Sequence, residues 1–216
     1  MATTIINRYR PVVQPRLPAA PNEYTAEFIE QYSNILRLYF NQLDNLTGAL
    51  LGESGGRFIR FPYGAFSSDQ DQTATANTAT LMTLNTTDFA NEVSIATSKI
   101  TVANSGIYNL QFSVQLENSS NAPQDVFIWL KQNGTDIVGS TGKIGMPARK
   151  NPGDPFHSIV GWNYYLSMTA GQYVEIYWST TSADVSIQFY AASASPTKPA
   201  TQSVVATMSF VSRLPT

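Results

Sequence analysis

Residues 106–117 read GIYNLQFSVQLE, and apolar and polar side chains alternate along the whole stretch. A two-residue period of this length is typical of a β-strand with one buried face. The side chains predicted to face the core are Tyr108, Leu110, Phe112, Val114 and Leu116. Comparable runs continue from Arg57 to the end of the chain, whereas residues 22–50 follow a helical period. About ten short strands, separated by turn signals such as Asn133-Gly134, predict an all-β sandwich or jelly roll behind one helix.

The composition restricts the classes of partner and of chemistry. Charged residues make up 13% of the 216 residues, which is roughly half of average usage, and the formal net charge is −2. A weakly charged, polar surface suits a subunit held in a fixed assembly, and it gives no reason to expect nucleic acid or anionic lipid as a partner. The chain has no cysteine. The sequence shows no signal peptide and no apolar stretch long enough to insert into a membrane, so we expect synthesis in a cytoplasm.

The first 21 residues are rich in proline and basic. Prolines at this density prevent a helix and favour an extended arm. Arg8, Tyr9, Arg10 and Arg16 are the residues expected to dock this arm on a partner. A disordered tail is the alternative, and the apolar side chains within the segment favour docking.

Residues 22–50 form the predicted helix, with Asn22 or Thr25 as its N-cap. Apolar side chains recur with spacings of four and three residues, which is the period of a nearly straight helix bundle. This stripe, the expected helical part of a trimer interface, comprises Phe28, Tyr32, Ile35, Tyr39, Leu43, Leu46 and Leu50. The alternative is a single amphipathic helix that lies against its own sheet. Residues 51–56 are expected to form a glycine-rich joint, and residues 57–216 the head domain.

Several predicted strands carry aromatic rings on the side opposite their core residues. These rings are Phe127, Trp129, Tyr173 and Tyr177. A monomeric sandwich buries only one face of each sheet, so outward rings need a cover. They predict a subunit interface made by a sheet face, and the alternative is that the tyrosines are ordinary surface residues. Residues 142–157 contain three prolines and three glycines and are expected to form a long surface loop.

The motifs of the head resemble the trimeric jelly roll of the complement C1q and tumour-necrosis-factor family. The resemblance rests on residues 63–67 (YGAFS), on Gly106-Ile107-Tyr108 at the start of a long strand, and on the stretch Ile128 to Gly134. A later segment, Ala170-Gly171-Gln172 followed by Val174-Glu175-Ile176, resembles another strand turn of the family, with Gln172 where an acid is usual. The resemblance covers roughly residues 60–212, and it implies a homotrimer with aromatic-rich sheet faces around a three-fold axis.

The N-terminal stretch from Pro15 to Leu46 resembles the start of small structural proteins of tailed bacteriophages, notably those of marine bacteria. This second resemblance implies a virion component, either a capsid decoration (cement) protein or a short head or tail fibre. The arm would then bind a capsid, neck or tail protein. The alternative is a receptor-binding fibre head that recognises a glycan or protein of the host surface.

The sequence offers little for catalysis. His157 is the only histidine and cannot form a zinc site alone. Asp69 and Asp71 are the best candidates for a weak calcium site, although two acids on a loop are usually just solvated. No nucleophile motif or phosphate-binding loop occurs. We therefore expect a protein that is not an enzyme and that has no cofactor and no catalytic or metal site.

Overall fold

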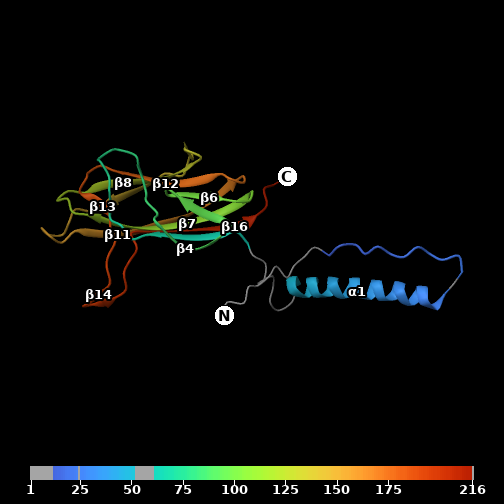
Figure 1. Cartoon of the computed structure of the whole chain (residues 1–216). Coiled ribbons are helices and arrows are strands. Elements are labelled where there is room, and N and C mark those ends of the chain that lie inside the picture. Colours follow the sequence, from blue (N-terminus) through green and yellow to red (C-terminus); the bar gives the residue numbers. More distant parts are fainter. Residues whose placement is uncertain (1–11, 24, 52–60, 216) are drawn as a thin grey trace. The chain divides into compact units, whose positions relative to one another are not determined.

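The structure is a computed structural model that describes residues 12–23, 25–51 and 61–215. The chain divides into two compact units, residues 1–60 and residues 61–216. The first contains the arm and helix α1, and the second contains every strand found in the described residues (Figure 1).

Helix α1 spans Ala26–Leu51. Its N-cap is Thr25, whose Oγ1 accepts a hydrogen bond of 3.2 Å from the backbone N–H of Phe28. Of the two predicted caps, the structure therefore selects Thr25, and the helix begins four residues later than the predicted start at residue 22. Leu51 still belongs to α1, and the rest of the predicted joint lies outside the described residues.

The second unit consists of sixteen strands. Their bounds are β1 Tyr63–Ser68, β2 Gln72–Thr73, β3 Thr80–Leu81, β4 Thr86–Asn91, β5 Val93–Ala96, β6 Lys99–Val102, β7 Gly106–Asn118, β8 Gln124–Gln132, β9 Thr135–Asp136, β10 Gly142–Met146, β11 Phe156–Met168, β12 Tyr173–Thr180, β13 Val185–Ile187, β14 Ser193–Ala194, β15 Thr197–Lys198 and β16 Val204–Ser212. Strands β7 and β11 are the longest, with 13 residues each, and they pair along their full length.

All of these strands except β14 and β15 form two packed antiparallel sheets of seven strands each (Figure 1). Sheet 1 has the order β2-β13-β7-β16-β1-β4. Strands β16 and β13 pair with successive parts of one side of β7, and β11 pairs along the whole of its other side. Sheet 2 has the order β10-β8-β12-β6-β5, with β3 and β9 attached at its rim. From β6 onward, the chain crosses repeatedly between the sheets, to β7, to β8 and β10, to β11, to β12 and back to β16. This order is that of a jelly roll, so the predicted all-β sandwich behind one helix is confirmed.

The core lies between the two sheets, and both sheets contribute buried side chains to it. The five predicted inward residues of β7 are all buried, from Tyr108 to Leu116. Trp178 on β12 is the largest fully buried side chain, and it faces a partner sheet that carries Tyr108 and Phe66. The two-residue period therefore located the core correctly on the long strands.

The prediction of a loop over residues 142–157 was wrong in its first part. Residues 142–146 form β10, which pairs with β8 from Gly142 opposite Ile128 to Met146 opposite Gln124. The glycines of this strand suggested a loop, but Gly142 leaves space for the indole of Trp162 on β11. A glycine in a strand often marks such a close approach rather than a turn.

A hairpin between β13 and β16 projects from the sandwich and was not predicted (Figure 1). Strands β14 and β15 form it, and the backbone groups of Tyr190 and Thr201 close its base with hydrogen bonds of 3.0 and 2.7 Å. We call residues 189–202 the finger.

Candidate functional site

The outer face of sheet 2 carries the four rings that the sequence predicted as a sheet interface. Phe127 and Trp129 come from β8, and Tyr173 and Tyr177 come from β12. All four side chains are half-buried. The Trp129 and Tyr177 rings lie opposite each other in the register, with centroids 5.9 Å apart. The structure therefore brings these two rings together in one layer.

Lysines of the same chain cover much of this layer. The Nζ of Lys99 lies 4.4 Å from the Tyr173 ring centroid, and that of Lys131 lies 4.5 Å from the Tyr177 centroid. Lys143 similarly lies 5.6 Å from the centroid of Phe127. Such cation–π contacts stabilise by roughly 0.5–1 kcal/mol at exposed sites and shield the ring from water.

Acidic side chains complete the cover of sheet 2. Asp136 accepts a hydrogen bond of 2.7 Å from Nε1 of Trp129 and also lies 3.4 Å from Nζ of Lys131. Lys143 forms an ion pair of 2.9 Å with Asp125. The outer face of sheet 2 consequently carries charged side chains, and two of its lysines form ion pairs within the chain.

The outer face of sheet 1 has the opposite character. Its central part, which we call the uncharged face, is made by the outward side chains of three adjacent strands: Ile107, Asn109, Gln111, Ser113 and Gln115 on β7, Ile159, Gly161, Asn163, Tyr165 and Ser167 on β11, and Val205, Thr207 and Ser209 on β16. It contains no charged side chain. Ile159 and Tyr165 are 69% and 60% exposed, so two large apolar groups stand in water on β11.

Further rings are exposed on the same sheet at its β4 side. Phe89 is 63% exposed and packs edge-on against Tyr63 of β1, with ring centroids 6.0 Å apart.

The sequence did contain a signal for outward rings on sheet 1, since Tyr165 lies on the opposite side of β11 from the core residues Tyr164 and Leu166. Sequence reasoning nevertheless favoured the rings of sheet 2, because strand patterns do not show which rings have lysine partners.

Strand β11 also forms an edge of sheet 1. Among the described residues it pairs only with β7, so the backbone groups along its other side have no strand partner. The inward side chains Val160, Trp162 and Tyr164 are only partly buried, although they pack against the core. Edge strands that are long and uncharged are usually blunted by lysine, proline or a bulge. None of these protects β11.

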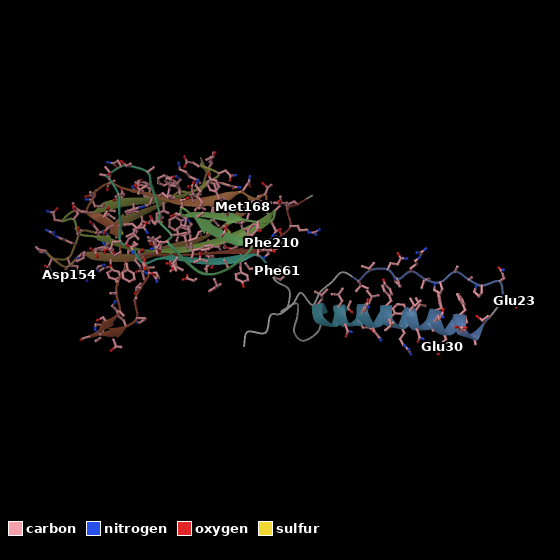
Figure 2. The ribbon with its side chains drawn as sticks, viewed as in Figure 1. Glu23, Glu30, Phe61, Asp154, Met168 and Phe210 are labelled. Atoms are coloured by element: carbon pink, nitrogen blue, oxygen red, sulfur yellow. The ribbon has the colours of Figure 1, made fainter. Side chains whose placement is uncertain are left out.

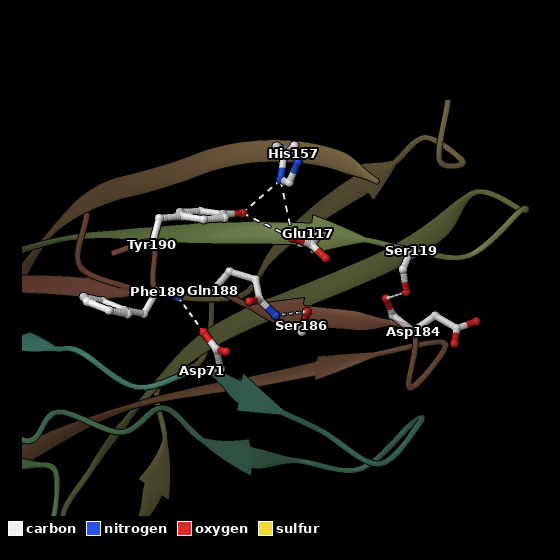
Figure 3. A network of polar contacts seen from close by, with 9 residues as sticks. All are labelled: Asp71, Glu117, Ser119, His157, Asp184, Ser186, Gln188, Phe189 and Tyr190. Atoms are coloured by element: carbon white, nitrogen blue, oxygen red, sulfur yellow. Dashed lines mark hydrogen bonds and ion pairs between the residues drawn. The ribbon is translucent and has the colours of Figure 1, made fainter. Parts of the chain in front are cut away.

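A polar cluster holds the finger on sheet 1 (Figure 3). The hydroxyl of Tyr190 lies 2.9 Å from Nδ1 of His157 and donates a hydrogen bond of 3.3 Å to Oε2 of Glu117. His157 stands opposite Glu117 in the β11–β7 register, with Nδ1 3.6 Å from the same oxygen. Burial raises the pKa of Tyr190 to about 12, and the negative charge of Glu117 acts in the same direction. The lone histidine is thus part of a structural clamp.

The candidate calcium ligands bind their own chain. Asp69 accepts hydrogen bonds from the side-chain amides of Gln70 and Asn85, and these bonds lower the pKa of its carboxyl group. Asp71 instead accepts a hydrogen bond of 2.7 Å from the backbone N–H of Phe189 (Figure 3). In the described residues, no group of three histidine, cysteine or acidic side chains is arranged to hold a metal ion.

An open cleft of about 460 Å³ lies at one end of the sandwich, lined by Pro123, Gln124, Asp125, Gly145, Met146, Pro147 and Thr181. The hydroxyl of Thr181 donates a hydrogen bond of 2.7 Å to Oε1 of Gln124 and accepts one of 2.9 Å from the backbone N–H of Asp125. Asp125 is also paired with Lys143, so the polar groups of the cleft are largely satisfied by one another.

The predicted docking residues fall mostly outside the structure. Arg8, Tyr9 and Arg10 lie outside the described residues, and Arg16 is exposed in the described part of the arm. On α1, the predicted interface residues from Phe28 to Leu46 are half-buried and share one face of the helix, whereas Leu50, the last residue of the predicted stripe, is exposed. No helix in the described part of the chain has the length and hydropathy needed to cross a bilayer.

No protein-family model matches the chain, and no curated protein matches it. Among solved structures, the chain is similar to the globular domain of the zebrafish complement 1qA protein, with 12% sequence identity and a TM-score of 0.41. The match covers 71% of this chain and 99% of that chain.

Proposed function

We propose that this chain is a non-enzymatic structural subunit of a tailed-phage virion. It assembles as a homotrimer and attaches to the particle through residues 1–21. The capsid decoration protein and the short head or tail fibre are the two positions on the particle that this role allows. The phage assignment derives from the N-terminal sequence resemblance, and the assembly role is supported by the surfaces of the sandwich.

The observation that carries the assembly role is the uncharged face together with the open edge β11. Burying a charged group in an interface costs free energy unless it is paired, and this face has no charge to bury. Its exposed Tyr165 and Ile159 supply apolar area, for which burial stabilises by roughly 25 cal/mol per Å². A neighbouring copy seated here would also shield the unpaired backbone of β11.

The charged outer face of sheet 2 offers a second surface for the same assembly. Phe127, Trp129, Tyr173 and Tyr177 remain the interface residues that the sequence favours. Their rings already have lysine partners within the chain, so a copy that binds them must displace those contacts or pack over them. Because of this cost, we favour the uncharged face over the outer face of sheet 2 as the interface between copies.

Native mass measurement with one variant on each surface tests the assembly and identifies the face. The intact chain should give three copies. Tyr165→Asp with Ile159→Asp should give single copies, because two carboxylates would enter the interface uncompensated. Val138→Asp is the matched control, since Val138 is 96% exposed on a loop outside both faces. If Tyr177→Asp dissociates the trimer and the sheet 1 pair does not, the interface lies on sheet 2. A single copy for the intact chain would refute the assembly role.

Attachment to the particle has its own test. A chain that lacks residues 1–21 should still form trimers but should not co-sediment with particles produced without the protein. Arg16→Glu in the intact chain should weaken attachment in a salt-dependent way, because an exposed arginine acts through screened charge. Attachment that survives the truncation would contradict the docking role of the arm.

Recognition of the host surface is the second candidate function. The open cleft between Pro123, Met146 and Thr181 is the feature that favours it, because binding sites for small groups are concave. The exposed rings, however, lie on a sheet face and not around this end of the sandwich. Incubating purified protein with host cells and with protein-free capsids separates the roles, and binding to cells alone would favour recognition.

A further inference from the structure

The apolar side chains of helix α1 differ in exposure according to their face. Phe28, Tyr32, Ile35, Tyr39, Leu43 and Leu46 are half-buried. Leu38 on the same helix is 61% exposed, and Phe40 is exposed as well. Side chains along the stripe cover part of one another, as the stacked rings of Phe28 and Tyr32 show. A segment packed on this face would cover the rest of it.

The arm shows a matching alternation with a period of three residues. Val12, Pro15 and Pro18 are half-buried, whereas Val13 is 78% exposed and Leu17 is exposed. A polyproline II segment has three residues per turn, so residues 12, 15 and 18 form one edge of it. The arm therefore presents a single edge to a neighbouring surface.

Figure 1 draws the arm folded back alongside α1, and Figure 2 shows side chains from both segments between them. The spacing of the rings along α1 is also close to the spacing of the prolines along the arm. Tyr32 and Tyr39 lie seven residues apart, which corresponds to roughly 10.5 Å along a helix. Pro15 and Pro18 lie three residues apart, which corresponds to roughly 9.3 Å along a polyproline II segment. Surfaces lined by aromatic rings are the ones that recognise polyproline II segments.

Charge favours the same pairing. Between residues 26 and 51 the helix carries Glu27, Glu30, Asp44 and a single base, Arg37. Residues 12–21 contain Arg16 and no acid. A basic proline-rich segment beside an acidic helix is attracted over a Debye length of about 10 Å at moderate salt.

We infer that the half-buried face of α1 is a binding surface for a polyproline II segment, and that residues 12–18 of the same chain occupy it. This face is also the one predicted to pair the helix with its copies. A single face accepts only one occupant, so arm binding and helix self-association exclude each other. Where the proposed function holds, capture of the arm by a particle would release the helix face and permit a stalk to form.

The absence of cysteine from the chain allows a direct test with single thiols in the intact protein. Leu43→Cys places a thiol on the covered face, and Leu38→Cys places one on the exposed face. In the otherwise unchanged chain, a maleimide should label the Leu38→Cys protein at least about tenfold faster, as expected for a site protected by a local contact. Similar rates for the two thiols would overturn the inference.

Substitutions in the arm then identify the cover. Pro15→Asp with Pro18→Asp should raise labelling of the Leu43→Cys thiol about tenfold when the chains are kept as single copies, by dilution and by Tyr165→Asp with Ile159→Asp in every protein compared. Val13→Asp with Leu17→Asp adds the same charge on the exposed edge of the arm and should leave the rate unchanged. An unchanged rate in the proline variant, or an equal increase in both, would show that the arm is not the cover.

Two further measurements distinguish release of the half-buried face of α1 from unfolding of the helix. A peptide of residues 12–21 should restore protection of the Leu43→Cys thiol in the proline variant, and a peptide with both prolines replaced by aspartate should not. At high protein concentration, the proline variant should form cross-links through this thiol that the intact arm suppresses. Loss of protection without rescue by the peptide would contradict the inference. The labelling is measured on single copies and without phage particles, so its outcome is distinguishable from the outcome of the tests of the proposed function.

Discussion

Trp162 of sheet 1 packs against Gly142 of sheet 2 so closely that a Cβ atom on this glycine would lie 2.5 Å from Cζ2 of the indole. The contact joins β11 to β10, the strands that form the open edges of the two sheets on one side of the sandwich. It therefore fixes the spacing of the sheets where no strand connects them.

Gly142→Ala should lower the free energy of unfolding by about 1–3 kcal/mol, because the new methyl group must displace a packed indole. Gly145→Ala is the control on the same strand, since a Cβ atom there meets nothing within 4 Å. Without strain, replacing a glycine stabilises by roughly 0.4–1 kcal/mol. Urea unfolding of both variants measures the difference. A Gly142→Ala protein as stable as the Gly145→Ala protein would mean that the indole has room to move.

The same contact explains where prediction from the sequence succeeded and failed on the fold. The alternation on β7 is a local property, so the buried face of that strand was correctly predicted before its partners were known. Gly142 in the predicted loop is required by a residue 20 positions later, and no local pattern reveals that dependence. Thr25 and Asn22 were equally plausible caps for the same reason, because local sequence allows both and the fold selects one.

The candidate surfaces depend even more on long-range pairing. The outward rings Trp129 and Tyr177 were visible as breaks in the apolar alternation. Their cover by Lys131 and Asp136 follows from the pairing of β8 with β9 and β12, which the sequence does not show. The clamp joins Tyr190 of the finger to His157 on β11 and Glu117 on β7, and the pairing of β11 with β7 places these last two residues opposite each other.

Asn118 at the end of β7 is fully buried, and its side chain organises the neighbouring loops. Its Nδ2 donates hydrogen bonds of 2.7 Å and 3.2 Å to the backbone carbonyls of Pro147 and Ala122, and its Oδ1 accepts one of 2.9 Å from the N–H of Ser120. Asn118→Asp would place a carboxylate against these carbonyl oxygens, and burial would hold the pKa of the new carboxyl group above its usual value.

Because the folded form of this variant would prefer the protonated acid, its stability should be greatest at low pH. It should fall as the pH rises through the unfolded value of about 4, and the deficit relative to the parent should reach its maximum near neutrality. Asn118→Ala is the comparison, with a loss of about 2–4 kcal/mol that does not depend on pH. Urea unfolding at a series of pH values distinguishes them. A deficit for Asn118→Asp that stays constant with pH would contradict the buried location of this side chain.

The raised pKa of Tyr190 predicts that the protein loses stability at alkaline pH. Its pKa is about 12 in the folded chain, mainly through burial, and about 10 in an unfolded chain. The folded state therefore prefers the neutral phenol. The stabilisation is complete below about pH 10 and is lost as the pH rises from about 10 to about 12. Tyr190→Phe should remove this contribution, so its stability should fall less steeply over that window.

Tyr63→Phe is the matched control, since Tyr63 on β1 is an exposed tyrosine outside the uncharged face. The pKa of Tyr108 is also raised by burial, and this group remains in both variants, so the comparison isolates Tyr190. Absorbance at the tyrosinate band follows ionisation, and urea unfolding at each pH gives stability. Limited proteolysis within residues 191–200 should also be faster in the Tyr190→Phe protein because the finger has lost its clamp. Identical alkaline profiles for the two phenylalanine variants would count against a protected phenol at residue 190.

Salt distinguishes the two possible faces of self-association without any substitution. An interface on the uncharged face contains no ion pair, so its dissociation constant should change little when the salt concentration rises from about 0.05 to about 1 M. An interface on sheet 2 would include Lys99, Lys131 and Lys143 with their acidic neighbours, and high salt would screen any pairing between copies. Sedimentation equilibrium across this range measures the constant. We expect weak dependence on salt, with a slight tightening because high salt strengthens apolar contacts. A dissociation constant that rises tenfold or more would place the interface on sheet 2 and would return Phe127 and Trp129 to its centre.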